Sequence, residues 1–364
     1  MSRPSGIEVP GFVDADQERR WWAARRTALD HVLRLCVEGS SGGALVLRGS
    51  MALTAWLGDA AREPGDLDWV MAPTWVWPID PCICHPHVDR AAVQQWPEAY
   101  DGAGAGELWR DDEFDTRGIR AYPPPEGLSW LASELDPYAD DDHGLGDPRP
   151  DLPELPDLEL IEALQLHPDA GAGVELAAAD AEREYVGNYD HYAVTGVRLV
   201  LPWRADGVPD GVIHVDYAIE ERLAEPARWT AIPRGDGGPP VAAATVSRAL
   251  SLAWKLLWLR TDAAAVAAGV DGAAGAFGKD LYDAVLLAES PDTRLDPSLL
   301  GRVLGAEPLP AGEIVRWRVD WDRFRADHPS VLGDGEAWLA RLARALEPVL
   351  GRGTPRGVEP GQMS

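Results

Sequence analysis

Two aspartates, Asp66 and Asp68, stand one residue apart in the segment Gly65-Asp66-Leu67-Asp68-Trp69-Val70. On an extended strand, residues two apart point to the same face, so the two carboxylates would project side by side while Leu67 faces the core. Carboxylates held this close repel each other unless a cation lies between them. A hard divalent ion suits them, with Mg²⁺ as the first choice and Mn²⁺ as the alternative. The pattern predicts a metal site; the other interpretation is an Asp-rich turn before an edge strand.

The segment that precedes these aspartates predicts a strand, a tight turn and a helix. Leu45–Leu47 is a short apolar run of strand type, Gly49-Ser50 interrupts it, and Met51–Leu57 is apolar and compatible with a helix. A glycine lets the backbone come close to a ligand, and the N–H groups at the start of a helix bind phosphate. We therefore expect the backbone at Gly49 and Ser50 to come close to a ligand, with free N–H groups of the helix beside it.

A site that holds two metal ions needs a third carboxylate beside this pair. Asp216 is the best candidate, because it lies in the predicted strand Val212–Ile219 on the face opposite Val215 and Tyr217. The alternative is an ordinary solvent-facing aspartate. Lys255 lies among apolar helix positions, where a lysine either extends its ammonium group to solvent or serves a ligand such as a triphosphate.

Four short motifs occur in a fixed order along the chain: Arg48-Gly49-Ser50, Arg62-x-x-x-Asp66-x-Asp68, Ala253-x-Lys255-Leu256 and Lys279-Asp280-x-x-Asp283. This set resembles the AbiEii-type nucleotidyltransferase toxins, which belong to the DNA polymerase β-like superfamily and include MenT-like relatives. The resemblance covers residues 33–70 and about 173–289. It implies an α+β fold with a polymerase β-like core, a mixed sheet flanked by helices, and a helical C-terminal part.

The same resemblance implies an NTP donor, Mg²⁺ as the cofactor and a cognate antitoxin protein as a partner; some relatives add nucleotides to the 3′ end of tRNA. It assigns catalytic roles to Asp66, Asp68, Asp216, Lys255 and Asp280, and NTP binding to Gly49, Ser50, Arg62 and Lys255. Lys279 stands where the family carries arginine. Asp280 and Asp283 share one helical face, where they serve the site or complement the helix dipole, and Asp283 would orient Lys255.

Two other functions stay open from the sequence. One is a nucleotidyltransferase that modifies a small molecule or a protein hydroxyl, which the net charge of −27 favours over tRNA. The other is a non-catalytic relative that only binds a partner. Because the composition predicts no general basic surface, DNA is not an expected partner.

The composition predicts a cytoplasmic protein. The 364 residues include three cysteines, Cys36, Cys82 and Cys84, which is typical of a reducing compartment. The N-terminus has no apolar signal region, and no run of about 18 apolar residues predicts a membrane helix. The run Cys82-Ile83-Cys84-His85-Pro86-His87 packs its potential ligands too tightly for one tetrahedral zinc site.

Changes in composition predict the domain organisation. We expect a nucleotidyltransferase core over 14–220 with an irregular insertion at about 73–156, a helical part over 240–350 and a disordered tail over 351–364. We also expect a first helix at 14–37, a β-rich run at 186–201 and a helix from Ala242 to Thr261. The arginines of the first helix are expected on its solvated face, with phosphate binding as the alternative: Arg19, Arg20, Arg25 and Arg26.

Overall fold

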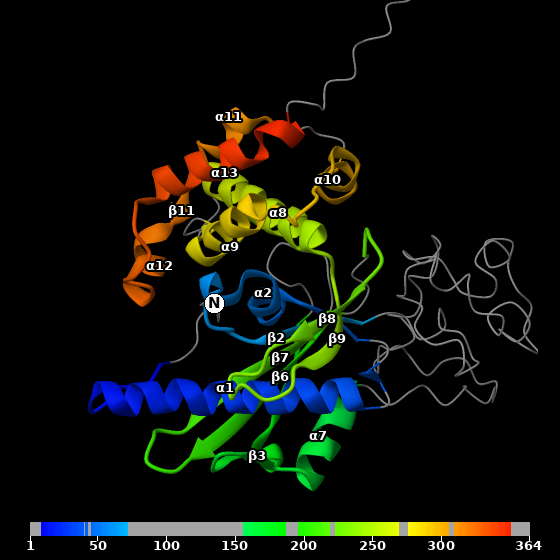
Figure 1. The fold of residues 1–364 in the computed structure, drawn as a ribbon, viewed down its shortest axis with the longest axis vertical. Coiled ribbons are helices and arrows are strands. Elements are labelled where there is room, and N and C mark those ends of the chain that lie inside the picture. Colours follow the sequence, from blue (N-terminus) through cyan, green and yellow to red (C-terminus); the bar gives the residue numbers. More distant parts are fainter. Residues whose placement is uncertain are drawn as a thin grey trace, which may run out of the picture. The chain divides into compact units, whose positions relative to one another are not determined.

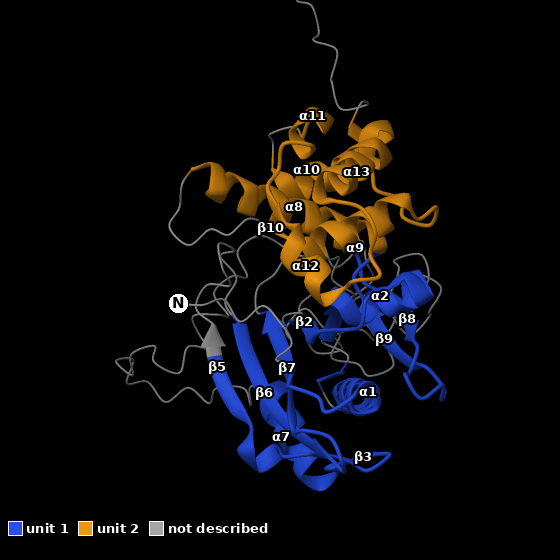
Figure 2. Cartoon of the chain, turned by 90° about the vertical axis from the view of Figure 1, so that its left-hand side faces the viewer, with its two compact units in different colours: residues 1–247 blue, residues 248–364 orange. Residues whose placement is uncertain are grey.

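The structure is a computed structural model that describes residues 9–39, 41–42, 45–71, 156–186, 196–218, 223–268, 276–305 and 309–350. The chain forms two compact units, residues 1–247 and residues 248–364, which Figure 2 shows in different colours. Within the described ranges, no helix combines the length and the apolar character needed to cross a membrane.

Unit 1 is a mixed sheet flanked by helices (Figure 1). Its strands run in the order β3-β4-β6-β7-β2-β1-β9-β8, and β5 also pairs with β6. The strands are β1 (Leu45–Arg48), β2 (Leu67–Met71), β3 (Asp169–Gly171), β4 (Val174–Leu176), β5 (Glu182–Val186), β6 (Gly196–Ala205), β7 (Gly211–Ala218), β8 (Arg228–Ile232) and β9 (Val241–Thr245). The neighbours β2 and β7 are parallel, whereas β1 is antiparallel to β2 and β6 is antiparallel to β7.

The long helix α1 (Ala15–Glu38) lies along one face of this sheet (Figure 1). The carboxylate of Asp14 accepts hydrogen bonds from the N–H groups of Asp16 and Gln17 and so caps the start of the helix. The predicted helix at 14–37 is therefore confirmed. The apolar stripe of α1 shares one core with alternate residues of the two central strands: Trp21, Leu29, Leu33, Leu67, Trp69, Val215 and Tyr217.

Two further α-helices of unit 1 matter for the site and its support. Helix α2 (Gly49–Leu57) follows β1 directly and packs against β2 and β8. Helix α7 (Pro156–Leu166) packs against α1. The direct passage from β1 into α2 places the start of this helix beside the beginning of β2, because β1 and β2 are neighbouring antiparallel strands.

Unit 2 is mainly helical in its described residues. Helix α9 packs between α8 and α13, and the short strands β10 and β11 pair in parallel. Its elements are α8 (Arg248–Ala267), β10 (Ala276–Phe277), α9 (Gly278–Glu289), α10 (Pro297–Leu304), α11 (Ala311–Ile314), β11 (Val319–Asp320), α12 (Trp321–Asp327) and α13 (Gly335–Leu350).

One prediction about secondary structure is wrong. The helix expected from Ala242 begins only at Arg248, because residues 241–245 form β9, which pairs with β1 and β8. Its small alanines favour a helix locally, but Ala243 and Ala244 are buried in the sheet, so tertiary pairing overrides the local preference. The β-rich run expected at 186–201 is confirmed in its described residues, because Val186 ends β5 and residues 196–201 belong to β6, which pairs antiparallel with β5.

Some predictions concern residues outside the described ranges. They include nearly all of the expected insertion, at 72–155, with its Cys82–His87 run, and the C-terminal tail at 351–364.

Candidate metal centre

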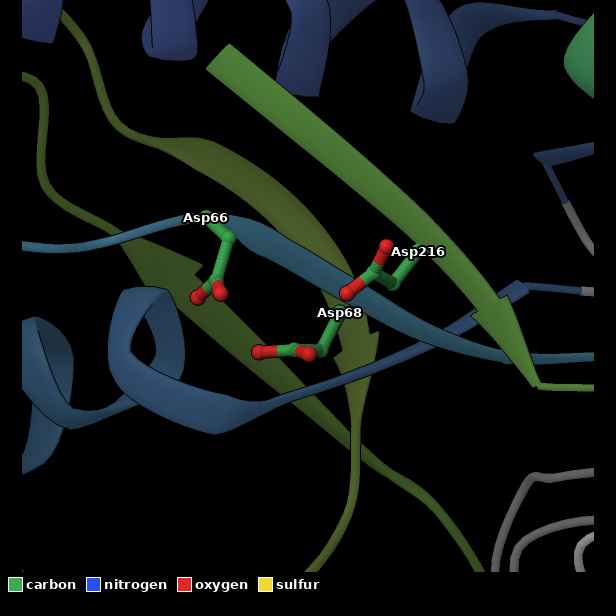
Figure 3. Close-up of side chains that lie close together, drawn as sticks. All are labelled: Asp66, Asp68 and Asp216. Atoms are coloured by element: carbon green, nitrogen blue, oxygen red, sulfur yellow. The ribbon is translucent and has the colours of Figure 1, made fainter. Parts of the chain in front are cut away.

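Three carboxylates of unit 1 lie close together (Figure 3). Asp66, Asp68 and Asp216 each offer one oxygen such that these atoms all lie within 4.8 Å of one another. Asp68 of β2 and Asp216 of β7 are direct partners in the register of the parallel pair, and Asp66 stands one residue before β2. The structure therefore brings together the three carboxylates that the sequence singled out.

The alternation of each strand explains why these carboxylates share a face. Leu67 and Trp69, on either side of Asp68, are buried in the core under α1. Val215 and Tyr217 flank Asp216 in the same way. Because successive side chains of a strand point to opposite faces, both aspartates face away from that core.

The glycine at the start of α2 is required by the position of Asp68. Gly49 has a φ of +74°, in the left-handed region that disfavours other residues, and a Cβ at this position would overlap the Asp68 carboxylate. The glycine thus lets the N-terminus of α2 approach the acidic cluster. The sequence predicted that the backbone at Gly49 comes close to a ligand. In the structure, this backbone comes close to the Asp68 carboxylate.

The hydroxyl of Ser50 holds the loop that carries Asp66. It donates to Oδ1 of Asp66 at 3.5 Å and accepts a hydrogen bond from the backbone N–H of Gly65 at 3.0 Å. Ser50 is buried, so this hydroxyl lies within the fold beside the cluster. Arg62, the other residue expected near a nucleotide, is half-buried in the same connection between α2 and β2.

Arg25 of α1 also supports this loop, and its expected place on a solvated face is wrong. Its side chain is buried and donates hydrogen bonds to the carbonyl oxygens of Pro64, at 2.6 Å, and Gly65. Burial lowers the pKa of Arg25 to about 10, while the charges of Asp66 and Glu63 oppose the shift. No local pattern around Arg25 indicates this role, because the loop that Arg25 holds lies far along the chain.

A second arginine missed by the sequence analysis, Arg198 of β6, binds Asp216 directly. Its Nε donates to Oδ1 of Asp216 and its Nη2 donates to Oδ2, both at 2.7 Å. Arg198 is also the register partner of Asp216 in the antiparallel pair of β6 and β7. On the other side of the cluster, Arg48 of β1 is the register partner of Asp68. The two central carboxylates are therefore flanked by an arginine on each side.

His214 lies two residues before Asp216 and therefore on the same face of β7. Burial lowers its pKa, and the charge of Arg198 lowers it further, whereas Asp216 and Asp66 act in the opposite direction. The imidazole is thus kept neutral near the acidic cluster. The metal-ligand group found among the described residues nonetheless consists of carboxylates alone.

The donor set fits a hard divalent cation. Three carboxylates supply only oxygen, which Mg²⁺ and Mn²⁺ prefer, and no sulfur ligand that would select a softer metal. Asp216 is buried and the other two are half-buried, so their repulsion is poorly screened by water. A cation at this place would relieve that repulsion, and the cluster can therefore hold a metal ion.

Three further residues of the predicted motifs form a cluster inside unit 2. Nζ of Lys255 lies 2.9 Å from Oδ1 of Asp280 and 2.9 Å from Oδ2 of Asp283. All three side chains are buried, so the alternative that Lys255 extends to solvent is wrong. The ion pair agrees with the expectation that Asp283 orients Lys255, and the contact of Lys255 with a triphosphate stays a prediction.

Two comparisons of the sequence with known proteins give no relative of this chain. No protein-family model matches the chain, and a search of curated proteins gives no match. The function must therefore be inferred from the site itself.

Proposed function

We propose that the chain is a metal-dependent nucleotidyltransferase that moves a nucleoside monophosphate from an NTP to an acceptor hydroxyl. The observation that carries this proposal is the cluster of Asp66, Asp68 and Asp216 beside the start of α2. A nucleoside triphosphate needs two elements at its binding site: carboxylates that can hold divalent cations and a helix N-terminus that can bind phosphate. Both lie next to each other here. Their position on one face of neighbouring strands supports the proposal.

The three aspartates would hold Mg²⁺, with Mn²⁺ as the alternative ion. When bound, the metal would lower the pKa of the attacking hydroxyl and neutralise the charge that develops on the pyrophosphate leaving group. Ser50 keeps Asp66 in place, and Arg25 holds the backbone of the same loop. These residues therefore hold Asp66 and its loop in place before any substrate binds, which lowers the cost of reorganisation during the reaction.

The start of α2 would receive the phosphates of the nucleotide. The first N–H groups of a helix have no partner inside the helix, and its dipole is positive at this end. Gly49 keeps the approach to this end of α2 open, since a larger residue would enter the space of Asp68. The roles of Arg62 and of the unit 2 residues Lys255 and Asp280 in NTP binding and catalysis are part of the same proposal, on the basis of the motifs alone.

The order of the four motifs supports membership of the AbiEii-type nucleotidyltransferase toxins and a polymerase β-like core. The mixed sheet of unit 1 and the mainly helical unit 2 are compatible with that assignment. Under this proposal the protein works in the cytoplasm and is neutralised by a cognate antitoxin. The acceptor is a hydroxyl of tRNA, of a protein or of a small molecule.

Label transfer from nucleotides tests the proposal. The full chain is incubated with each α-labelled NTP, Mg²⁺ and a cell lysate separated into RNA, protein and small molecules. Label in one fraction, with release of pyrophosphate, is the expected result, and the labelled fraction identifies the class of acceptor. Transfer of label from the γ-phosphate instead would show a kinase-type reaction and contradict the proposal.

The Asp68→Asn variant provides the site control, because it removes one negative charge with little change in shape. It should fold as the wild type does and transfer no label. Full activity in this variant would separate the reaction from the three-aspartate cluster.

A further inference from the structure

The contact between Arg198 and Asp216 joins a cation to a proposed metal ligand. Both oxygens of Asp216 accept a hydrogen bond from the guanidinium of Arg198, each at 2.7 Å. The side chains are largely buried, with exposed fractions of 12% for Arg198 and 4% for Asp216. A two-point contact of this kind is among the stronger ion pairs in proteins.

This pair belongs to a row of charged residues that crosses five strands of the sheet. Register partners place Glu184 of β5 opposite Arg198 of β6, Arg198 opposite Asp216 of β7, Asp216 opposite Asp68 of β2, and Asp68 opposite Arg48 of β1. The charges along the row are therefore negative, positive, negative, negative and positive. Directly opposed side chains have Cβ atoms about 4.5–5.5 Å apart, so each charge lies within reach of its neighbours.

A metal ion and the guanidinium of Arg198 would compete for the carboxylate of Asp216. A divalent cation coordinated by Asp216 needs at least one of the oxygens that now accept hydrogen bonds from Arg198. The cation would also bring two positive charges close to the guanidinium, and like charges at this separation repel strongly in a partly buried site. Metal binding at the three aspartates and the two-point contact of Arg198 therefore oppose each other.

Glu184 offers the guanidinium another carboxylate. It lies in the row on the side of Arg198 away from Asp216, and its side chain is exposed. A long arginine side chain that turns away from Asp216 can thus meet Glu184 without leaving its place on β6. The row therefore offers Arg198 one carboxylate in the metal-free protein, Asp216, and another in the metal-bound protein, Glu184.

We propose that Arg198 is a displaceable counterion of the metal site: it neutralises Asp216 in the metal-free protein and turns towards Glu184 when a divalent cation takes Asp216. This inference rests on the proposed metal site and adds a residue that sets its affinity. Arg198 acts through Asp216 and is thus a positioning residue. It keeps the three carboxylates together without metal and weakens the binding of the metal.

The test measures the Kd of Mn²⁺ by electron paramagnetic resonance on the full chain without nucleotide. Arg198→Gln should bind Mn²⁺ more tightly, by about tenfold, because the competing charge-assisted hydrogen bonds are removed. Without metal, this variant should also unfold at a lower temperature than the wild type. Added Mn²⁺ should raise its unfolding temperature by more than it raises that of the wild type. If Arg198 were a permanent support that orients Asp216, the same variant would bind Mn²⁺ more weakly, and this result would overturn the proposal.

Glu184→Gln should have the opposite effect. Without this carboxylate Arg198 stays more firmly on Asp216, so Mn²⁺ affinity should fall by about two- to threefold, in line with an exposed ion pair. The matched control is Glu182→Gln, because Glu182 lies on the same side of β5 but opposite the apolar Val200. Equal effects of these two changes would contradict the role of Glu184.

Arg204→Gln controls for the loss of a positive charge on β6, since Arg204 is exposed and pairs with Asp180 and Asp210. It should leave the affinity for Mn²⁺ unchanged. If Arg198→Gln fails to fold, Arg198→Lys keeps the charge but not the two-point contact, and it should also bind Mn²⁺ more tightly than the wild type. If the wild type does not bind Mn²⁺ at all, both the metal site and the counterion proposal are refuted. If the wild type binds Mn²⁺ but Arg198→Gln does not bind it more tightly, only the counterion proposal is refuted.

Discussion

The backbone of Gly49 lies so close to the carboxylate of Asp68 that a Cβ on this residue would overlap it. The two residues come from different elements, the first turn of α2 and the strand β2. Their contact couples the backbone conformation at the start of the helix to the geometry of the acidic cluster. A residue larger than glycine must therefore move Asp68, the start of α2, or both.

Gly49→Ala tests this coupling. We expect weaker binding of Mn²⁺ and a loss of stability above the cost of about 1–2 kcal/mol that a left-handed backbone alone imposes on alanine. The matched control is Gly58→Ala at the other end of α2, where φ is +54° and the added Cβ would meet nothing within 4 Å apart from the adjoining backbone. Thermal unfolding and metal titration of both variants measure the difference. Identical losses in the two variants would show that strain alone, and not the approach to Asp68, explains the effect.

The buried ion cluster of unit 2 gives a prediction about stability. Lys255→Met removes the ammonium that lies between Asp280 and Asp283 and leaves two buried carboxylates without it. We expect a loss of about 3–5 kcal/mol in the free energy of unfolding, measured by chemical denaturation.

The triple variant that adds Asp280→Asn and Asp283→Asn should recover part of this loss, because the uncompensated charges are then gone. Lys279→Met on the same helix is the control, since Lys279 is half-buried outside this cluster, and it should have a small effect. If Lys255→Met alone is as stable as the wild type, the cluster does not stabilise unit 2. Activity of Lys255 variants is informative only when unit 2 is shown to be folded.

Cys36 gives a prediction about pH. Its thiol is buried in α1 next to the hydroxyl of Tyr217, and burial raises its pKa from 9.0 to about 12. Above pH 9 the thiol loses its proton in the unfolded chain but keeps it in the folded chain. Its contribution to stability is therefore complete below pH 9 and is lost as the pH rises from 9 to about 12.

The measurement compares the free energy of unfolding of the wild type and of Cys36→Ala between pH 8 and 10, where a single group contributes a slope of up to about 1.4 kcal/mol per pH unit. The variant should lose stability less steeply with pH, whatever its stability at pH 8. Parallel curves for the two proteins would contradict the raised pKa. The wild-type thiol should also resist alkylation until the protein unfolds.

The sequence predicted the parts of the site that depend on local patterns. Asp66 and Asp68 are two residues apart, and Asp216 lies in an alternating strand, so their faces follow from the pleat. Gly49 and Ser50 mark the turn into α2 through residue type alone. The structure adds that the three carboxylates meet, because β2 and β7 are parallel neighbours.

Arg25 and Arg198 could not be identified in the same way. Arg25 acts on a loop far along the chain, at Pro64 and Gly65, and Arg198 acts on Asp216 only through the register of the neighbouring strands β6 and β7. A pattern of apolar residues shows which face of an element is buried, but not which polar residue meets it from another element. The strand at Val241–Thr245 was missed for a related reason, since its alanines become a strand through their pairing with β1 and β8.

The most direct test of the metal site is a crystal of the full chain grown with MnCl₂, measured for anomalous scattering of manganese. The account predicts an anomalous peak bonded to oxygens of Asp66, Asp68 and Asp216, with the guanidinium of Arg198 turned away from at least one oxygen of Asp216. Crystals of Asp216→Asn grown in the same way should lose the peak or most of its height. Manganese bound elsewhere in the wild type, with none at the three aspartates, would contradict the central claim.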